Sequence, residues 1–149
     1  MSALDQNIEK LNIHLARFKD RGILHRIAGE DIAGGGGSFA TISPVDKSTI
    51  CEVARGDAGD IDKAAKAAKA AFPTWRDMPA KERKAILISI AEGIEARAEE
   101  IALCECWDTG QAWRFMSKAA IRGAENFRYF ADQVGAARDG QHLQSPTLM

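Results

Sequence analysis

The sequence is poor in cysteine, histidine and tyrosine, and its first residues lack the pattern of a secretory leader. Its 149 residues include three cysteines, three histidines and one tyrosine. A small, odd number of cysteines does not build a disulfide framework. Residues 1–10 contain Asp5 and Glu9 and have no apolar stretch of the signal-peptide kind. We therefore expect reduced thiols and a cytoplasmic location.

The sequence also has no excess of one charge and no long apolar run. The 20 basic and 21 acidic residues leave a net charge of -1. This balance gives no field that would attract nucleic acid or an anionic membrane, and no run is long enough to cross a bilayer. We expect neither nucleic acid nor a membrane as a partner. A content of 46% hydrophobic and 28% charged residues is ordinary for one globular domain.

The cysteines and histidines, which often serve as nucleophiles or metal ligands, do not have the spacing of a catalytic or metal site. Cys104 and Cys106 are two residues apart on a predicted helix, so they point to different faces, and a zinc pair would need further ligands nearby. We interpret them, and Cys51, as packing residues. The histidines are widely spaced along the chain: His14, His25 and His142.

What is present is helical periodicity from the start of the chain. Residues 4–19 predict an amphipathic helix because apolar residues recur at steps of three and four. These residues are Ile8, Leu11, Leu15 and Phe18. Asp5 is expected to cap the start of this helix and Gly22 to end it. We expect its apolar face to pack on the same or a neighbouring subunit.

The next stretch favours short strands. Residues 23–27 are a strand candidate, and residues 39–43 and 50–55 predict a hairpin around the turn residues 44–48. Four successive glycines at 34–37 predict a mobile loop. A phosphate-binding loop would need a helix after it and usually a lysine, whereas here a strand follows.

Most of the remaining sequence predicts helices. The first spans residues 60–72, is expected to end at Pro73, and has one apolar face: Ile61, Ala64, Ala65, Ala68, Ala71 and Phe72. The second begins after Pro79 and continues, through a bend or a break, to Gly110. The last spans 116–134, with Phe115 and Gly123 on its buried side and Gly123 allowing a close helix crossing. Residues 140–149 are polar and have no partner strand within the chain.

The order of several short motifs resembles the amino-terminal part of the NAD(P)-dependent aldehyde dehydrogenases. The motifs lie at residues 40–44 (Ala-Thr-Ile-Ser-Pro), 79–83 (Pro-Ala-Lys-Glu-Arg), 105–111 (Glu-Cys-Trp-Asp-Thr-Gly-Gln) and 127–131 (Phe-Arg-Tyr-Phe-Ala). The resemblance covers residues 23–140. Residues 105–120 look closest to one subgroup, the 5-carboxymethyl-2-hydroxymuconate semialdehyde dehydrogenases of bacterial homoprotocatechuate breakdown. Where the family usually has Gly-Lys-Pro, this chain has Gly-Gln-Ala at 110–112.

The resemblance implies an α/β fold of which this chain holds the front part, mainly α-helical with a short β-hairpin and without the Rossmann core. It divides the chain into an amino-terminal helix (1–22) and a truncated part of the NAD-binding domain (23–149). Family members oxidise an aldehyde through a cysteine thiohemiacetal, with hydride transfer to NAD and a glutamate that activates water. Those groups lie beyond the matched region, so no catalytic or NAD-binding residue is assigned, and the chain alone is expected to be inactive.

One family site carries over in part, a structural site for Na⁺ or K⁺. The matching positions are Thr41 and Ile42, through backbone carbonyls, and Asp108, through its carboxylate. Oxygen ligands suit a hard cation. The remaining protein ligand would fall after Met149, so the site would be incomplete here. The alternative is that Asp108 ends its helix while the strand carbonyls contact water.

Two functional hypotheses remain open at this point. In the first, the chain is the front part of a semialdehyde dehydrogenase whose substrate is a small-molecule aldehyde. In the second, the chain is a non-catalytic helical module that is derived from such an enzyme and binds other proteins. Under the first hypothesis the helices lack their sheet and expose apolar faces, so we expect a homo-oligomer.

Overall fold

The computed structural model describes residues 2–136, and the expectation for residues 140–149 lies outside them. The described part contains six helices and four short strands. The helices are α1 (Ala3–Arg21), α2 (Ala58–Asp77), α3 (Ala80–Ala96), α4 (Ala98–Thr109), α5 (Trp113–Met116) and α6 (Ala119–Gln133). The strands are β1 (His25–Ile27), β2 (Glu30–Ile32), β3 (Ser38–Ile42) and β4 (Thr49–Ala54). None of these helices is long and apolar enough to cross a membrane.

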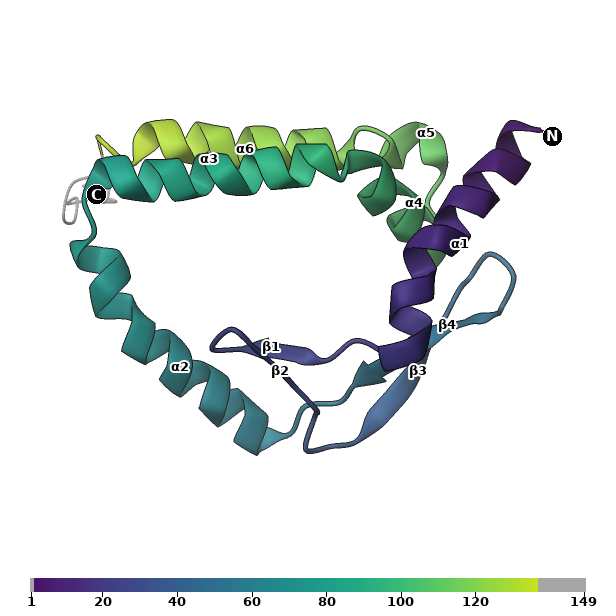
Figure 1. The fold of residues 1–149 in the computed structure, drawn as a ribbon, viewed down its shortest axis with the longest axis horizontal. Helices are drawn as coiled ribbons and strands as arrows, with labels where there is room; N and C mark the ends of the chain where they lie inside the picture. Colours follow the sequence, from purple (N-terminus) through teal and green to yellow (C-terminus); the bar gives the residue numbers. More distant parts are fainter. Residues whose placement is uncertain (1, 137–149) are drawn as a thin grey trace, which may run out of the picture.

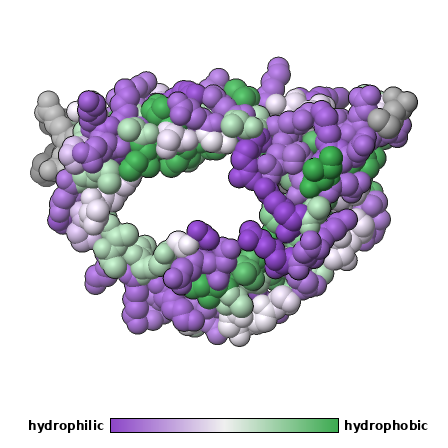
Figure 2. Space-filling model, in the orientation of Figure 1, coloured by the Kyte–Doolittle hydropathy of each residue, from purple (hydrophilic) through white to green (hydrophobic). Residues whose placement is uncertain are grey.

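The elements form an open ring rather than stacked layers (Figure 1). Helices α3 and α6 lie side by side along one side, α2 forms a second side, the hairpins form a third, and α1 with α4 closes the fourth. The space-filling view shows that side chains leave the middle of the ring open (Figure 2). Hydrophobic residues lie along the parts of α3 and α2 that border this opening.

The predicted hairpin is confirmed, and a second one accompanies it. Strands β3 and β4 pair antiparallel, with a register irregularity between Thr41 and Ile42. Strands β1 and β2 also pair antiparallel, although only the first had been expected as a strand. Ala28 and Gly29 join them with positive φ angles of 54° and 83°, as a two-residue hairpin turn requires. Alanine is not a usual residue at such a turn, so this hairpin could not be predicted from its turn residues.

The main core joins α1, β4 and α4. Its buried side chains are Leu11, Leu15, Ile50, Cys51 and Leu103, with Phe18, Val53, Cys104 and Trp107 packed around them. The amino-terminal helix therefore covers its own chain. Its N-cap is Ser2, not Asp5 as expected; Asp5 is the third helical residue and completes a capping box. Gly22 ends α1 as predicted.

A second packing region joins α3 and α6. Here small side chains are buried: Ala91, Ala120, Ala124 and Ala131. The prediction that Gly123 allows the close crossing is wrong, because a Cβ built there would meet no atom within 4 Å. Phe115 was also expected to be buried, yet it is 55% exposed, because α5 and α6 are separate helices and not one segment.

Helix α2 departs furthest from the expectation. It begins at Ala58, with Asp57 and Asp60 forming a capping box, and it continues through Pro73 to Asp77. Proline removes one backbone hydrogen bond from a helix, but its fixed φ is compatible with helical geometry, so the last turn persists. Among its residues only Asp60 is buried, so the apolar face predicted for this helix is uncovered in the described chain.

Candidate functional site

The loop end of the β3–β4 hairpin is fastened to the last turn of α4. The Thr41 hydroxyl donates a hydrogen bond to Asp108 Oδ1 over 3.1 Å. The fully buried Ser43 donates its hydroxyl hydrogen to the carbonyl oxygen of Trp107 over 2.7 Å and accepts the Val45 N–H at 3.2 Å. The structure thus brings together Thr41 and Asp108, with Ile42 next to Thr41 on the strand. We call Thr41, Ser43, Trp107 and Asp108 the hairpin–helix latch.

The helix end at this latch is electrically suited to a cation. Helix α4 has no basic residue in its last turn, so the negative end of its dipole is not neutralised from within the helix. Gly110, with a φ of 74°, forms the C-cap, and its N–H donates to the carbonyl of Cys106. Asp108 is therefore not the residue that ends the helix, and its carboxylate faces the hairpin, where it accepts from Thr41.

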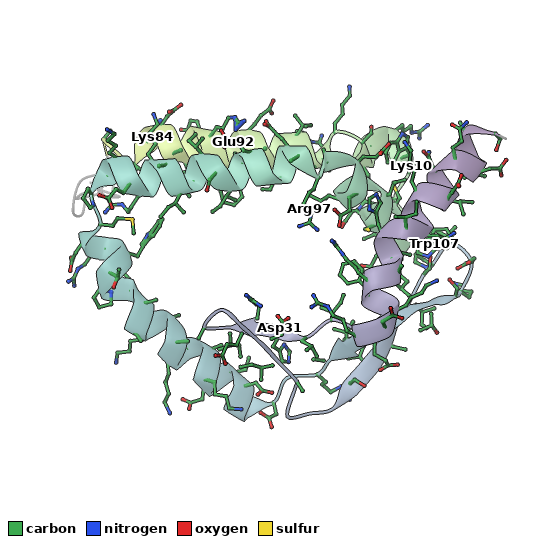
Figure 3. All side chains as sticks on the ribbon, viewed as in Figure 1. Lys10, Asp31, Lys84, Glu92, Arg97 and Trp107 are labelled. Atoms are coloured by element: carbon green, nitrogen blue, oxygen red, sulfur yellow. The ribbon has the colours of Figure 1, made fainter. Side chains whose placement is uncertain are left out.

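The pKa values of the three cysteine thiols around this site are raised. Burial raises the pKa of the Cys51 thiol, and the Asp108 carboxylate raises it further. Burial is also the largest cause of the raised pKa of Cys104 and of Cys106. A catalytic cysteine needs a lowered pKa, so none of the three has the environment of an activated nucleophile. Figure 3 shows Trp107 on α4, on the side of the ring where α1 lies.

An apolar cavity of about 340 Å³ lies beside the latch. It opens between α1, the β3–β4 hairpin and α4, and Thr41 and Asp108 contribute its polar part. Its remaining lining is apolar or sulfur-bearing: Leu15, Phe18, Ile23, Phe39, Ile50, Cys51, Val53 and Cys104. Within residues 2–136 no group of three or more His, Cys, Asp or Glu side chains is placed to hold a metal ion. A cation at the latch would therefore depend on carbonyl oxygens.

A second polar cluster was missed by the sequence analysis, at the start of α2. The buried Asp60 carboxylate accepts the N–H of Gly35 at 2.7 Å and that of Asp57 at 3.2 Å. These two hydrogen bonds lower the pKa of Asp60 to about 2, and the bond from Gly35 has the larger effect. Lys63 also donates to it. The signal for this cluster was the Asp-x-x-Asp spacing at 57–60, which is a capping pattern.

Hydrogen bonds tie the glycine run to Asp60 and to the backbone of Arg55. Besides the Gly35 bond to Asp60, the N–H of Gly36 donates to the Arg55 carbonyl, and the Arg55 N–H donates to the Gly37 carbonyl. A Cβ on Gly34 would lie 2.0 Å from the Arg55 carbonyl oxygen. Glycine is needed at Gly34 because the two backbones approach closely there, which the composition of the run alone did not reveal.

The described chain is a ring of helices and two hairpins that the latch helps to close, and comparison with known proteins shows the family to which it belongs. The model of the aldehyde dehydrogenase family matches residues 32–148. A probable aldehyde dehydrogenase of Mycobacterium tuberculosis is 44% identical over 99 residues, which are 66% of this chain and 20% of that protein. Acetaldehyde dehydrogenase of Pseudomonas aeruginosa is 43% identical over the same shares of the two chains.

Solved structures give the same result. HpcC from Thermus thermophilus superposes with a TM-score of 0.83 at 40% identity, over 89% of this chain and 26% of that one. PnpE in complex with nicotinamide adenine dinucleotide superposes with a TM-score of 0.72 at 36% identity, over 74% and 23% of the two chains. The chain belongs to the aldehyde dehydrogenase family, and the predicted fold class is confirmed. It spans about a fifth of the length of the curated relatives it matches.

Proposed function

We propose that this chain supplies the amino-terminal part of an NAD-dependent dehydrogenase that oxidises 5-carboxymethyl-2-hydroxymuconate semialdehyde to its carboxylate. The observation that carries the proposal is the match of residues 32–148 to the family model, together with the 40% identity to HpcC. The choice of this substrate rests on residues 105–120, which resemble that subgroup.

In the proposed reaction the aldehyde, NAD⁺ and water give the carboxylate, NADH and protons. A cysteine outside the matched region would add to the carbonyl as its thiolate, and water would hydrolyse the thioester left after oxidation. NAD supplies the hydride acceptor when bound. The residues of this chain act on none of these bonds. They form the ring around the opening in which the following part of the enzyme would fit (Figure 2). The latch joins the β3–β4 hairpin to α4 within this ring.

The test is to read the source gene beyond the codon for Met149 and to assay its complete product. The expected result is a frame that continues into a Rossmann sheet and a cysteine nucleophile, with NADH formed from the semialdehyde. The 149-residue chain is the control and is expected to form no NADH. A complete product without a nucleophile would overturn the proposal. A product more active on acetaldehyde than on the semialdehyde would overturn only the substrate.

We also propose that the carbonyls of Thr41 and Ile42 and the carboxylate of Asp108 form part of a site for Na⁺ or K⁺. The support is the proximity of Thr41 to Asp108 and the uncompensated helix end. Potassium chloride is expected to raise the melting temperature above its value in tetramethylammonium chloride at equal ionic strength. Asp108→Asn should abolish this difference, and the exposed Asp62→Asn should keep it. An unchanged difference in Asp108→Asn would exclude the site.

A further inference from the structure

Ser43 is a fully buried serine directly after β3, and each of its hydrogen-bonding groups has a partner. Its hydroxyl donates to the Trp107 carbonyl over 2.7 Å and accepts the Val45 N–H at 3.2 Å. Its own N–H donates to the Ser48 carbonyl over 2.9 Å, and its carbonyl accepts the Lys47 N–H at 3.0 Å. One residue thus joins the turn of the β3–β4 hairpin to the last turn of α4.

The contacts of Ser43 also determine where the end of β3 lies. Thr41 and Ser43 are two positions apart, as residues on one face of an extended chain are. They contact adjacent residues of α4, Asp108 and Trp107 respectively. The register of the hairpin changes between Thr41 and Ile42, and an irregularity of this kind interrupts the ladder and bends the strand. Since the ladder is interrupted there, the contacts to α4 hold the strand end in place.

The same stretch supplies the oxygen atoms of the proposed Na⁺ or K⁺ site. The carbonyls of Thr41 and Ile42 come just before Ser43 in the chain, and Asp108 comes just after Trp107, which accepts the Ser43 hydroxyl. A hard cation binds oxygen ligands within a narrow range of distances. A shift of the hairpin end relative to α4 would therefore move the carbonyls away from the cation. All contacts of Ser43 given above lie within the described residues.

We propose that Ser43 is a positioning residue of this cation site. Its hydrogen bond to Trp107 holds the carbonyls of Thr41 and Ile42 at the distance from Asp108 that the cation needs, while Ser43 itself is not a ligand. The inference rests on the proposed Na⁺ or K⁺ site. Removing a group that orients metal ligands typically lowers metal affinity about 10–100-fold. By linkage, a cation bound at the latch must in turn strengthen the hydrogen bonds of Ser43.

The first test measures the potassium response by thermal unfolding, with tetramethylammonium chloride keeping the ionic strength constant. Ser43→Ala should raise the KCl concentration needed for a given rise in melting temperature at least about tenfold. A serine with only a structural role would lower the melting temperature equally in both salts and leave that concentration unchanged. Ser89→Ala is the matched control, because the Ser89 hydroxyl also donates to a backbone carbonyl, that of Ile86, but lies on α3 and outside the latch.

A second variant, Ser43→Cys, covers the case in which the space left by alanine prevents folding. Cysteine fills nearly the same volume, but its S–H is a weak donor. This variant should therefore need at least about tenfold more KCl as well. Circular dichroism must show that each variant compared keeps the helix content of the parent.

A third measurement needs no substitution. Val45 donates its N–H to the Ser43 hydroxyl, so amide hydrogen exchange at Val45, followed by NMR, should be slower in KCl than in tetramethylammonium chloride. The Ser48 amide is the control, because it donates to Asp46 within the turn and should change less.

The outcomes separate the two proposals. A parent whose melting temperature does not respond to potassium would overturn the cation site, and the role of Ser43 with it. A response in the parent that either folded Ser43 variant retains at the same KCl concentration would overturn the role of Ser43 alone. Exchange at Val45 that potassium slows no more than at Ser48 would do the same. None of these results depends on enzymatic activity.

Discussion

At the scale of single residues, Gly34 is held where any side chain would meet backbone. A Cβ there would lie 2.0 Å from the Arg55 carbonyl oxygen and 2.9 Å from the Arg55 nitrogen. Because backbone cannot swing aside as a flexible side chain does, Gly34→Ala should destabilise the protein by about 1–3 kcal/mol, the usual cost of overpacking. Urea unfolding followed by circular dichroism measures this. Gly93→Ala is the control, because nothing lies within 4 Å of a Cβ on that helical glycine; a loss of equal size there would contradict the argument.

Asp60 links the same glycine turn to α2 through a charge, so its contribution depends on pH. Its pKa of about 2 in the folded protein is below the value of about 3.9 expected in the unfolded chain. The stabilisation is therefore complete above about pH 4 and is lost as the pH falls toward the folded pKa. The difference in unfolding free energy between the parent and Asp60→Asn should shrink over this interval. A difference that stays constant down to pH 2 would contradict it, and Asp62→Asn, at an exposed site, provides the baseline.

At the scale of elements, α6 carries a glycine for which its packing gives no reason. Gly123 lies within the helix, and a Cβ there would meet no atom within 4 Å. Gly123→Ala should therefore stabilise the chain by about 0.5–1 kcal/mol, because alanine loses less backbone entropy in a helix. A rise in the urea midpoint with an unchanged slope would confirm this. A destabilised variant would show that a further chain approaches α6 at Gly123, as the sequence analysis had expected of a helix crossing.

An element could be predicted from the sequence where neighbouring residues determine it, and not where distant residues do. The periodic apolar residues of α1 and the turn residues at 44–48 are local signals, and both elements formed where expected. Thr41 and Asp108 could be paired only through the family resemblance, because they are 67 positions apart in sequence. Ser43 and Asp60 were missed because each acts on backbone groups that are distant in sequence. Exposed apolar faces were expected for helices that lack their sheet, and α2 has one. That α2 in particular would be uncovered could not be predicted, because periodicity shows that a helix face is apolar and does not show which element covers it.

At the scale of the whole molecule, the open ring fixes how much surface folding can bury. The 10975 Å² that remain exposed mean that the chain buries about 53% of the surface of its unfolded state, whereas a compact domain of this length buries about 68–70%. Since the urea m-value scales with the surface exposed on unfolding, the monomer should have an m-value about a quarter lower than a compact domain of 149 residues. Unfolding at low protein concentration measures it. A full-sized m-value in a dilute sample would contradict the open ring itself, since it would require the exposed apolar residues of α2 and the inner side of α3 to be covered within one chain.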